Sequence, residues 1–115
     1  MSFRSVRNLT TNTILVIDLR VADTFWSRLR GLLGTSSMPA GQGLLITPCN
    51  SIHMFGMRYA LDVVFLDKNL QIIKLLHALS PGKTAYCPGS AHVLELPAGI
   101  LADSLTKIGD QLSIT

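Results

Sequence analysis

Charged residues, cysteines, aromatic residues and long apolar runs are all scarce in this 115-residue sequence, and each scarcity excludes a class of protein. Only 15% of the residues are charged and 48% are hydrophobic, which excludes a disordered chain. The longest apolar runs, at residues 14–17 and 63–66, are far shorter than the ~20 residues that a membrane-spanning helix needs. We therefore expect a soluble protein with an unusually complete core.

We do not expect the N-terminal region to be a secretory signal. Arg4 and Arg7 are followed by the polar stretch at residues 8–12, where an export signal would require a continuous apolar core. A cytoplasmic location is the expectation that follows.

Basic residues exceed acidic ones by three, and this excess is concentrated near the N-terminus. Nucleic-acid-binding proteins usually add a basic run or interleaved stacking aromatics to such an excess. Neither is present, so no nucleic-acid partner is predicted, although the charge would suit an acidic partner. The early basic residues are Arg4, Arg7, Arg20, Arg28 and Arg30.

The two cysteines are expected to be free thiols, because a chain this rich in apolar residues does not need a disulfide. Cys49-x-x-x-His53 and Cys87-x-x-x-x-His92 supply the ligand types of a zinc centre. On a strand, however, Cys49 and His53 would lie about 13 Å apart, at ~3.3 Å per residue. No metal or cofactor is predicted, and whether the cysteines pair or join a metal site stays open.

Short segments rich in β-branched and apolar residues alternate with turn signals, which predicts a mainly β fold. We expect one domain over residues 1–115, built as an antiparallel β-sandwich or flattened barrel with one or two short helices. The Lys68-Asn69 break predicts a tight hairpin, and residues 35–43 form a loop. The predicted strands are 14–21, 43–47, 51–55, 60–67, 70–79, 91–96 and 111–115, and the predicted helices are 25–33 and 98–105.

Polar side chains gather in the apolar segment 49–67, which is where we predict a site. Such groups are costly to bury without partners. Small-molecule sites combine apolar walls with a few placed polar groups, so we predict a ligand- or partner-binding cleft with loop 35–43 as its lid. The residues that border this cleft are His53, Phe55, Met57, Arg58 and Asp62.

Two other functions fit the same residues. A small hydrolase would use His53 as a base with Asp62 or Glu95 as the carboxylate, although strand alternation alone could place Glu95 in solvent. A structural or protein-interaction module would satisfy His53 and Arg58 internally, for example through an Arg58–Asp62 ion pair. The sequence does not identify the ligand or the oligomeric state.

Five ordered motifs resemble the family called domain of unknown function 192: DTFWSRLRGLLG, GLLI, IHMFGMRYALDVVFLD, HVLELPAG and IGDQL. The resemblance covers about residues 22–112, and the strand at 14–21 is expected to join the same fold. It implies a compact, mainly β protein and no established activity. The resemblance also implies that many members are exported behind a signal peptide, and we expect this chain to differ from them in that respect.

Overall fold

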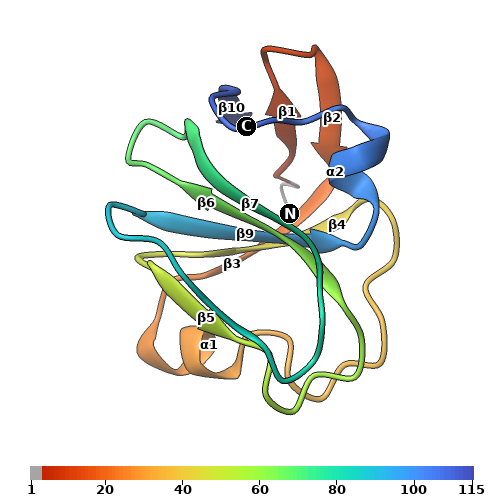
Figure 1. The fold of residues 1–115 in the computed structure, drawn as a ribbon, viewed down its shortest axis with the longest axis vertical. Coiled ribbons are helices and arrows are strands. Elements are labelled where there is room, and N and C mark those ends of the chain that lie inside the picture. Colours follow the sequence, from red (N-terminus) through yellow and green to blue (C-terminus); the bar gives the residue numbers. More distant parts are fainter. Residues whose placement is uncertain (1–3) are drawn as a thin grey trace.

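A five-stranded sheet divides the protein into two layers, in a computed structural model that describes residues 4–115 (Figure 1). Its strand order is β3-β4-β9-β6-β7. All neighbours in it are antiparallel except β3 and β4, which run parallel. These strands are β3 (Asp18–Ala22), β4 (Gln42–Ile46), β6 (Leu61–Leu66), β7 (Ile72–Leu79) and β9 (His92–Pro97).

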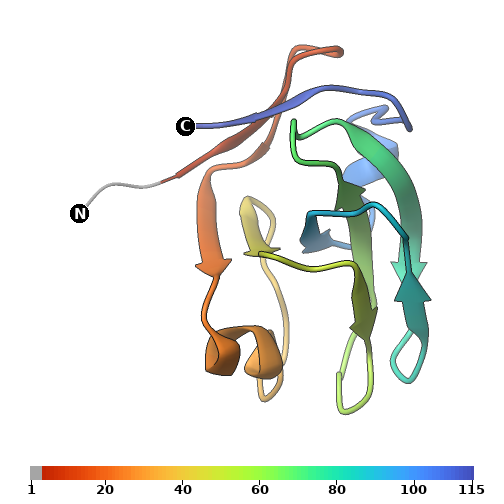
Figure 2. The same cartoon turned by 90° about the vertical axis from the view of Figure 1, so that its left-hand side faces the viewer.

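Smaller sheets cover the two faces of this central sheet (Figures 1 and 2). One face packs against the sheet β10-β1-β2 and the other against the pair β5-β8. Two short helices complete the fold. The covering elements are β1 (Val6–Asn8), β2 (Thr13–Val16), β5 (Ser51–His53), β8 (Thr84–Tyr86), β10 (Leu112–Ile114), α1 (Phe25–Arg30) and α2 (Ile100–Asp103).

Strand alternation divides the apolar residues of the central sheet between two cores. On β6, Val64 and Leu66 belong to the core under β1 and β2. Leu61, Val63 and Phe65 belong to the core under β5 and β8. Successive side chains of a strand point to opposite faces. The parity of a residue, that is, whether its number along β6 is even or odd, therefore decides which core its side chain reaches.

The mainly β fold with two short helices is confirmed, and the sheets are open rather than closed into a barrel. The hairpin at Lys68-Asn69 is also confirmed, because β6 and β7 pair across it. The Asp67 carboxylate accepts the backbone N–H of Asn69 and of Gln71, both at 2.9 Å, which stabilises the turn.

Several predicted boundaries differ from the structure. The predicted strand 14–21 is divided between β2 and β3 at Ile17, whose N–H donates to the carbonyl of Gly41. The predicted helix 25–33 ends at Arg30, because Gly31 has a φ of 50° that favours glycine and terminates a helix. The strands β1 and β8 lay outside the predicted elements. None of the helices within residues 4–115 has the length and apolar character needed to cross a membrane.

Candidate functional site

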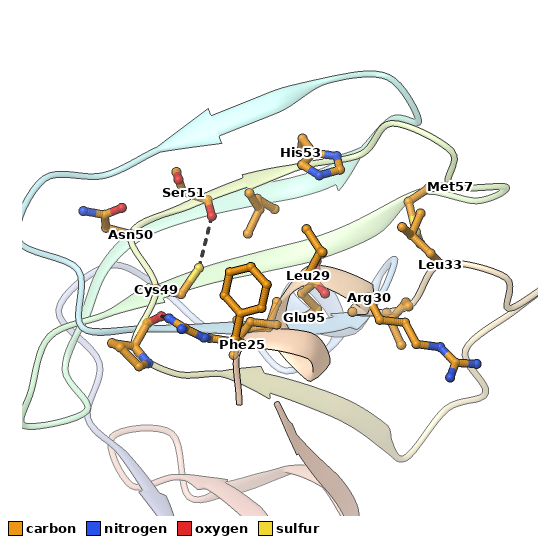
Figure 3. A pocket seen from close by; sticks show the side chains of 16 residues that line it. Phe25, Leu29, Arg30, Leu33, Cys49, Asn50, Ser51, His53, Met57 and Glu95 are labelled. Atoms are coloured by element: carbon orange, nitrogen blue, oxygen red, sulfur yellow. Dashed lines mark hydrogen bonds between the residues drawn. The ribbon is translucent and has the colours of Figure 1, made fainter. Parts of the chain in front are cut away.

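A cavity of about 410 Å³ lies between α1 and the loop that joins β4 to β5. Helix α1 and the turn after it form one wall, and residues 48–53 form the opposite wall (Figure 3). Glu95 of β9 lies between these walls. The lining includes Phe25, Arg28, Leu29, Arg30, Leu33, Cys49, Asn50, Ser51, His53, Met57 and Glu95.

Helix α1 is held by its ends rather than by a buried face. Thr24 caps the N-terminus: its hydroxyl accepts the N–H of Ser27, and the Ser27 hydroxyl accepts the N–H of Thr24, a capping box. None of the residues of α1 is buried. Phe25 is 65% exposed and Leu29 56% exposed, so the helix presents apolar side chains at the rim of the cavity.

Arg28 joins α1 to the opposite wall. Its Nη1 donates to the carbonyl of Pro48 at 3.2 Å and its Nε to the carbonyl of Thr24 at 3.4 Å. The side chain of Arg30 extends away from Glu95 (Figure 3). Arg28 is therefore the basic group that is fixed beside the cavity.

Glu95 is the most unusual residue of the site. It pairs with Leu44 on β4 and Val63 on β6, and both belong to the core under β5 and β8. Glu95 is only 5% exposed, and within residues 4–115 no hydrogen bond or ion pair reaches its carboxyl group. Burial raises the pKa of Glu95 from its ordinary value to about 7, because an apolar environment disfavours the charged form.

The thiol of Cys49 lies in the same electrostatic environment. Burial raises the pKa of Cys49, and the charge of Glu95 raises it further. The hydrogen bond from its Sγ to the carbonyl of Ser51, at 3.1 Å, and the charge of Arg28 oppose the shift. A thiol with a raised pKa holds little thiolate at neutral pH, so Cys49 is not an activated nucleophile.

The structure brings two of the five predicted site residues to this cavity. His53 and Met57 line it, whereas Phe55, Arg58 and Asp62 do not. Phe55 stacks on the His53 ring with 5.3 Å between the centroids, and both side chains are exposed. Arg58 is exposed in the turn before β6. A binding role for Phe55 or Arg58 stays a prediction.

Asp62 lies on the other face of the central sheet. It shares the parity of Val64 on β6 and is fully buried. Its carboxylate accepts the backbone N–H of Ala78 at 2.8 Å, of Gly99 at 3.1 Å and of Leu101 at 2.9 Å. It therefore joins β7 and α2 to β6, and its oxygens bind these backbone donors rather than Arg58 or His53.

The loop expected to act as a lid also lies elsewhere. Residues 35–43 contribute nothing to the cavity lining, which α1 supplies instead. The Thr35 hydroxyl contacts the Tyr59 hydroxyl at 2.7 Å and donates to the carbonyl of Leu32. These bonds anchor the start of the loop to the turn after α1 and to Tyr59.

The ligand types noted for zinc are not gathered in one place. Both cysteines are free thiols, as predicted. The Nδ1 atom of His92 is 2.7 Å from the Thr47 hydroxyl. Within residues 4–115, no group of three or more His, Cys, Asp or Glu side chains is arranged to hold a metal ion.

Sequence reasoning missed the contribution of α1. Phe25 and Leu29 have the spacing of a core-facing helical stripe, but the helix lies at the rim of a cavity and leaves both exposed. Glu95 had a recognisable signal, since it interrupts the apolar run of β9. That interruption did not decide between solvent and a cavity.

Comparison with known proteins places the chain in a family. The model of the family DUF192, described as "Uncharacterized ACR", matches residues 6–114. The chain belongs to the DUF192 family. It is 32% identical to a UPF0127 protein of Thermococcus sibiricus over 91% of this chain and 71% of that protein. A UPF0127 protein of Pyrococcus furiosus is 30% identical, over 91% of this chain and 93% of the relative.

Two crystal structures share the fold of this DUF192 chain. A protein of unknown function from Novosphingobium aromaticivorans has a TM-score of 0.82, with 96% of this chain and 82% of that chain covered. A putative transcription regulator from Sinorhizobium meliloti has a TM-score of 0.83, with 96% and 90% covered. Both are 19% identical in sequence, so the likeness concerns the fold alone.

Proposed function

We propose that this DUF192 protein is a small-molecule-binding module whose ligand occupies the cavity between α1 and residues 48–53. The main support is the unpaired Glu95 carboxyl group at the wall of a cavity. A volume of about 410 Å³ is within the usual range of ligand pockets, about 300–1,000 Å³. Apolar walls with a few polar groups complete the features of such a pocket.

The cavity also favours a binding module over a purely structural one. A structural or protein-interaction module would leave no cavity beside His53 and would satisfy the polar groups internally. His53 lines the cavity, and Glu95 lacks an internal partner among residues 4–115. Among residues 4–115 no fully buried side-chain oxygen or nitrogen lacks a hydrogen-bond partner, so the carboxyl oxygens of Glu95 are open to the cavity and a ligand there can supply their hydrogen bonds.

A fragment screen followed by nuclear magnetic resonance tests the proposal on the isotope-labelled full chain. We expect at least one fragment to shift the amide signals of α1, residues 48–53 and Glu95. Binding that maps instead to the groove beside Lys74 and Tyr86, or no binding across a broad library, would contradict the proposal.

Two matched variants give this screen a control. Leu29 lines the cavity and Ile14 lies on β2, and each is 56% exposed. Leu29→Trp should weaken the binding of a cavity fragment because the larger side chain occupies part of its space. Ile14→Trp adds the same bulk on the other side of the protein and should leave the affinity unchanged.

An enzyme that transfers protons through Glu95 is the second candidate function. His53 and Glu95 line the same cavity, and a carboxyl group with a pKa of about 7 suits acid–base catalysis at neutral pH. Hydrolysis of chromogenic esters by the wild type, lost in Glu95→Gln and rising with pH through about 7, would support it. Equal hydrolysis by both proteins would exclude a catalytic role of Glu95.

A further inference from the structure

We infer that the cavity selects ligands carrying an ammonium or guanidinium group, which binds the Glu95 carboxylate while an apolar part of the ligand packs against Phe25 and Leu29. This inference rests on the proposed binding function and specifies its ligand class. It follows from three observations: the lack of a partner for the Glu95 carboxyl group among residues 4–115, the orientation of the basic side chains, and the apolar lining of the cavity.

The first step concerns the missing partner. Leu44 and Val63, the strand neighbours of Glu95, are apolar and offer no side-chain donor. The backbone of this part of β9 is engaged in sheet pairing with β4 and β6. An ionised carboxylate accepts hydrogen bonds and donates none, so the group that completes it must bring N–H or O–H donors. A cation brings both donors and the opposite charge.

The second step concerns the basic side chains, which do not neutralise Glu95. Two donor nitrogens of Arg28 are held by the carbonyl groups of Thr24 and Pro48. Arg30 extends away from Glu95 (Figure 3). The position opposite the carboxylate is therefore left for a ligand.

The third step concerns the walls. Phe25 and Leu29 of α1 and Met57 after β5 give the cavity an apolar lining, and Phe25 and Glu95 line the same cavity (Figure 3). An aromatic face attracts an organic cation, and the aliphatic side chains cover the carbon skeleton attached to it. Together these features favour a cation on an apolar body over a small hydrated ion.

Four other charged or titratable side chains line this cavity: Arg28 and Arg30 on α1, Cys49 after β4, and His53 on β5. These side chains can also influence the binding of a cation. The contribution of Glu95 must therefore be isolated by substitution. Glu95→Gln keeps nearly the same shape and removes the charge at every pH.

The experiment uses three probes with one aromatic ring and different head groups: benzylamine, benzyl alcohol and benzoate. Their dissociation constants are measured by nuclear magnetic resonance titration of the full chain at pH 6 and pH 8. We expect benzylamine to bind most tightly at pH 8. Its affinity should rise about tenfold between pH 6 and pH 8, because only the ionised fraction of Glu95 binds it.

The variants decide which group is responsible. In Glu95→Gln, benzylamine should bind about tenfold more weakly at pH 8, since a neutral amide replaces a charge-assisted partner, and the change with pH should largely disappear. Asp103→Asn removes an exposed carboxylate on α2 and should behave as the wild type does.

The results also separate this inference from the proposed function. Tightest binding of benzoate, with affinity falling as pH rises, would overturn the inference, because Glu95 would then act as a protonated donor to an anion. It would still support binding in the cavity. Equal affinity of benzylamine for wild type and Glu95→Gln would likewise overturn it. If none of the probes binds while other fragments occupy the cavity, the cation preference is wrong and the binding function stands.

Discussion

Replacing Glu95 by glutamine should remove a large part of the pH dependence of folding stability between pH 5 and pH 8. The pKa of Glu95 is about 7 in the folded protein, against an ordinary value of 4.5. Between these values the folded state holds a proton that the unfolded state has released. Stability must therefore fall as pH rises from about 4.5 to about 7 and stay at the lower level above that.

The magnitude follows from the same pKa difference. One pKa unit corresponds to about 1.4 kcal/mol, so ionised Glu95 lowers the free energy of unfolding by about 3 kcal/mol at high pH. About 2 to 3 kcal/mol of this loss falls between pH 5 and pH 8. This is a large share of the stability of a domain of this size, which is typically about 5–15 kcal/mol.

Urea unfolding followed by circular dichroism at pH 5, 6, 7 and 8 measures the effect. The informative quantity is the difference in slope between wild type and Glu95→Gln, because all other side chains are the same in both proteins. Asp103→Asn, which removes an exposed carboxylate, should keep the wild-type slope. A Glu95→Gln protein whose stability changes with pH as steeply as that of the wild type would refute the assignment of a buried, unpaired carboxyl group.

The remaining predictions concern Asp62, which joins β6 to β7 and α2, and Thr24, which caps α1. Asp62→Asn should lower the free energy of unfolding by about 2 to 4 kcal/mol. The two carboxylate oxygens accept three backbone N–H groups, and the substitution turns one of these acceptors into a donor. A loss below about 1 kcal/mol in urea unfolding would contradict this role. Thr24→Ala removes the cap of α1 and should cost about 1 kcal/mol. In Thr24→Ala, amide hydrogen exchange in α1 should be faster than in the wild type, while exchange in the central sheet should be unchanged. Equal exchange rates of α1 in both proteins would count against its being held by this cap.

The hairpin between β6 and β7 could be predicted because its signals are local. A short polar break separates two apolar runs, and the Asp67 side chain closes the turn. β1 was missed because its partner β10 lies at the opposite end of the sequence, and no local pattern reports such a pairing. β8 is short and follows the Pro81-Gly82 turn, so its three residues carry little strand signal.

For a related reason, the sequence predicts only part of the candidate site. The concentration of polar residues in 49–67 directed attention to His53 and Met57, and the structure places both at the cavity. It also included Asp62, which has the opposite parity on β6 and reaches the other core. The exact register of a strand decides between these faces. The wall formed by α1 depends on tertiary packing that the helical spacing of Phe25 and Leu29 does not specify.

Asp62 and Glu95 show how two buried acidic residues on neighbouring strands can be distinguished. Asp62 pairs with Leu96, and Glu95 pairs with Val63, so the carboxyl groups leave the same sheet in opposite directions. Asp62 meets three backbone donors, and its burial is explained by the architecture alone. Glu95 meets none among residues 4–115 and faces a cavity. An apolar residue at position 95 would extend the surrounding core without the cost of about 3 kcal/mol at neutral to high pH. No contact within residues 4–115 offsets that cost, and this contrast is the physical reason why we propose a ligand-binding role for Glu95 and a structural role for Asp62.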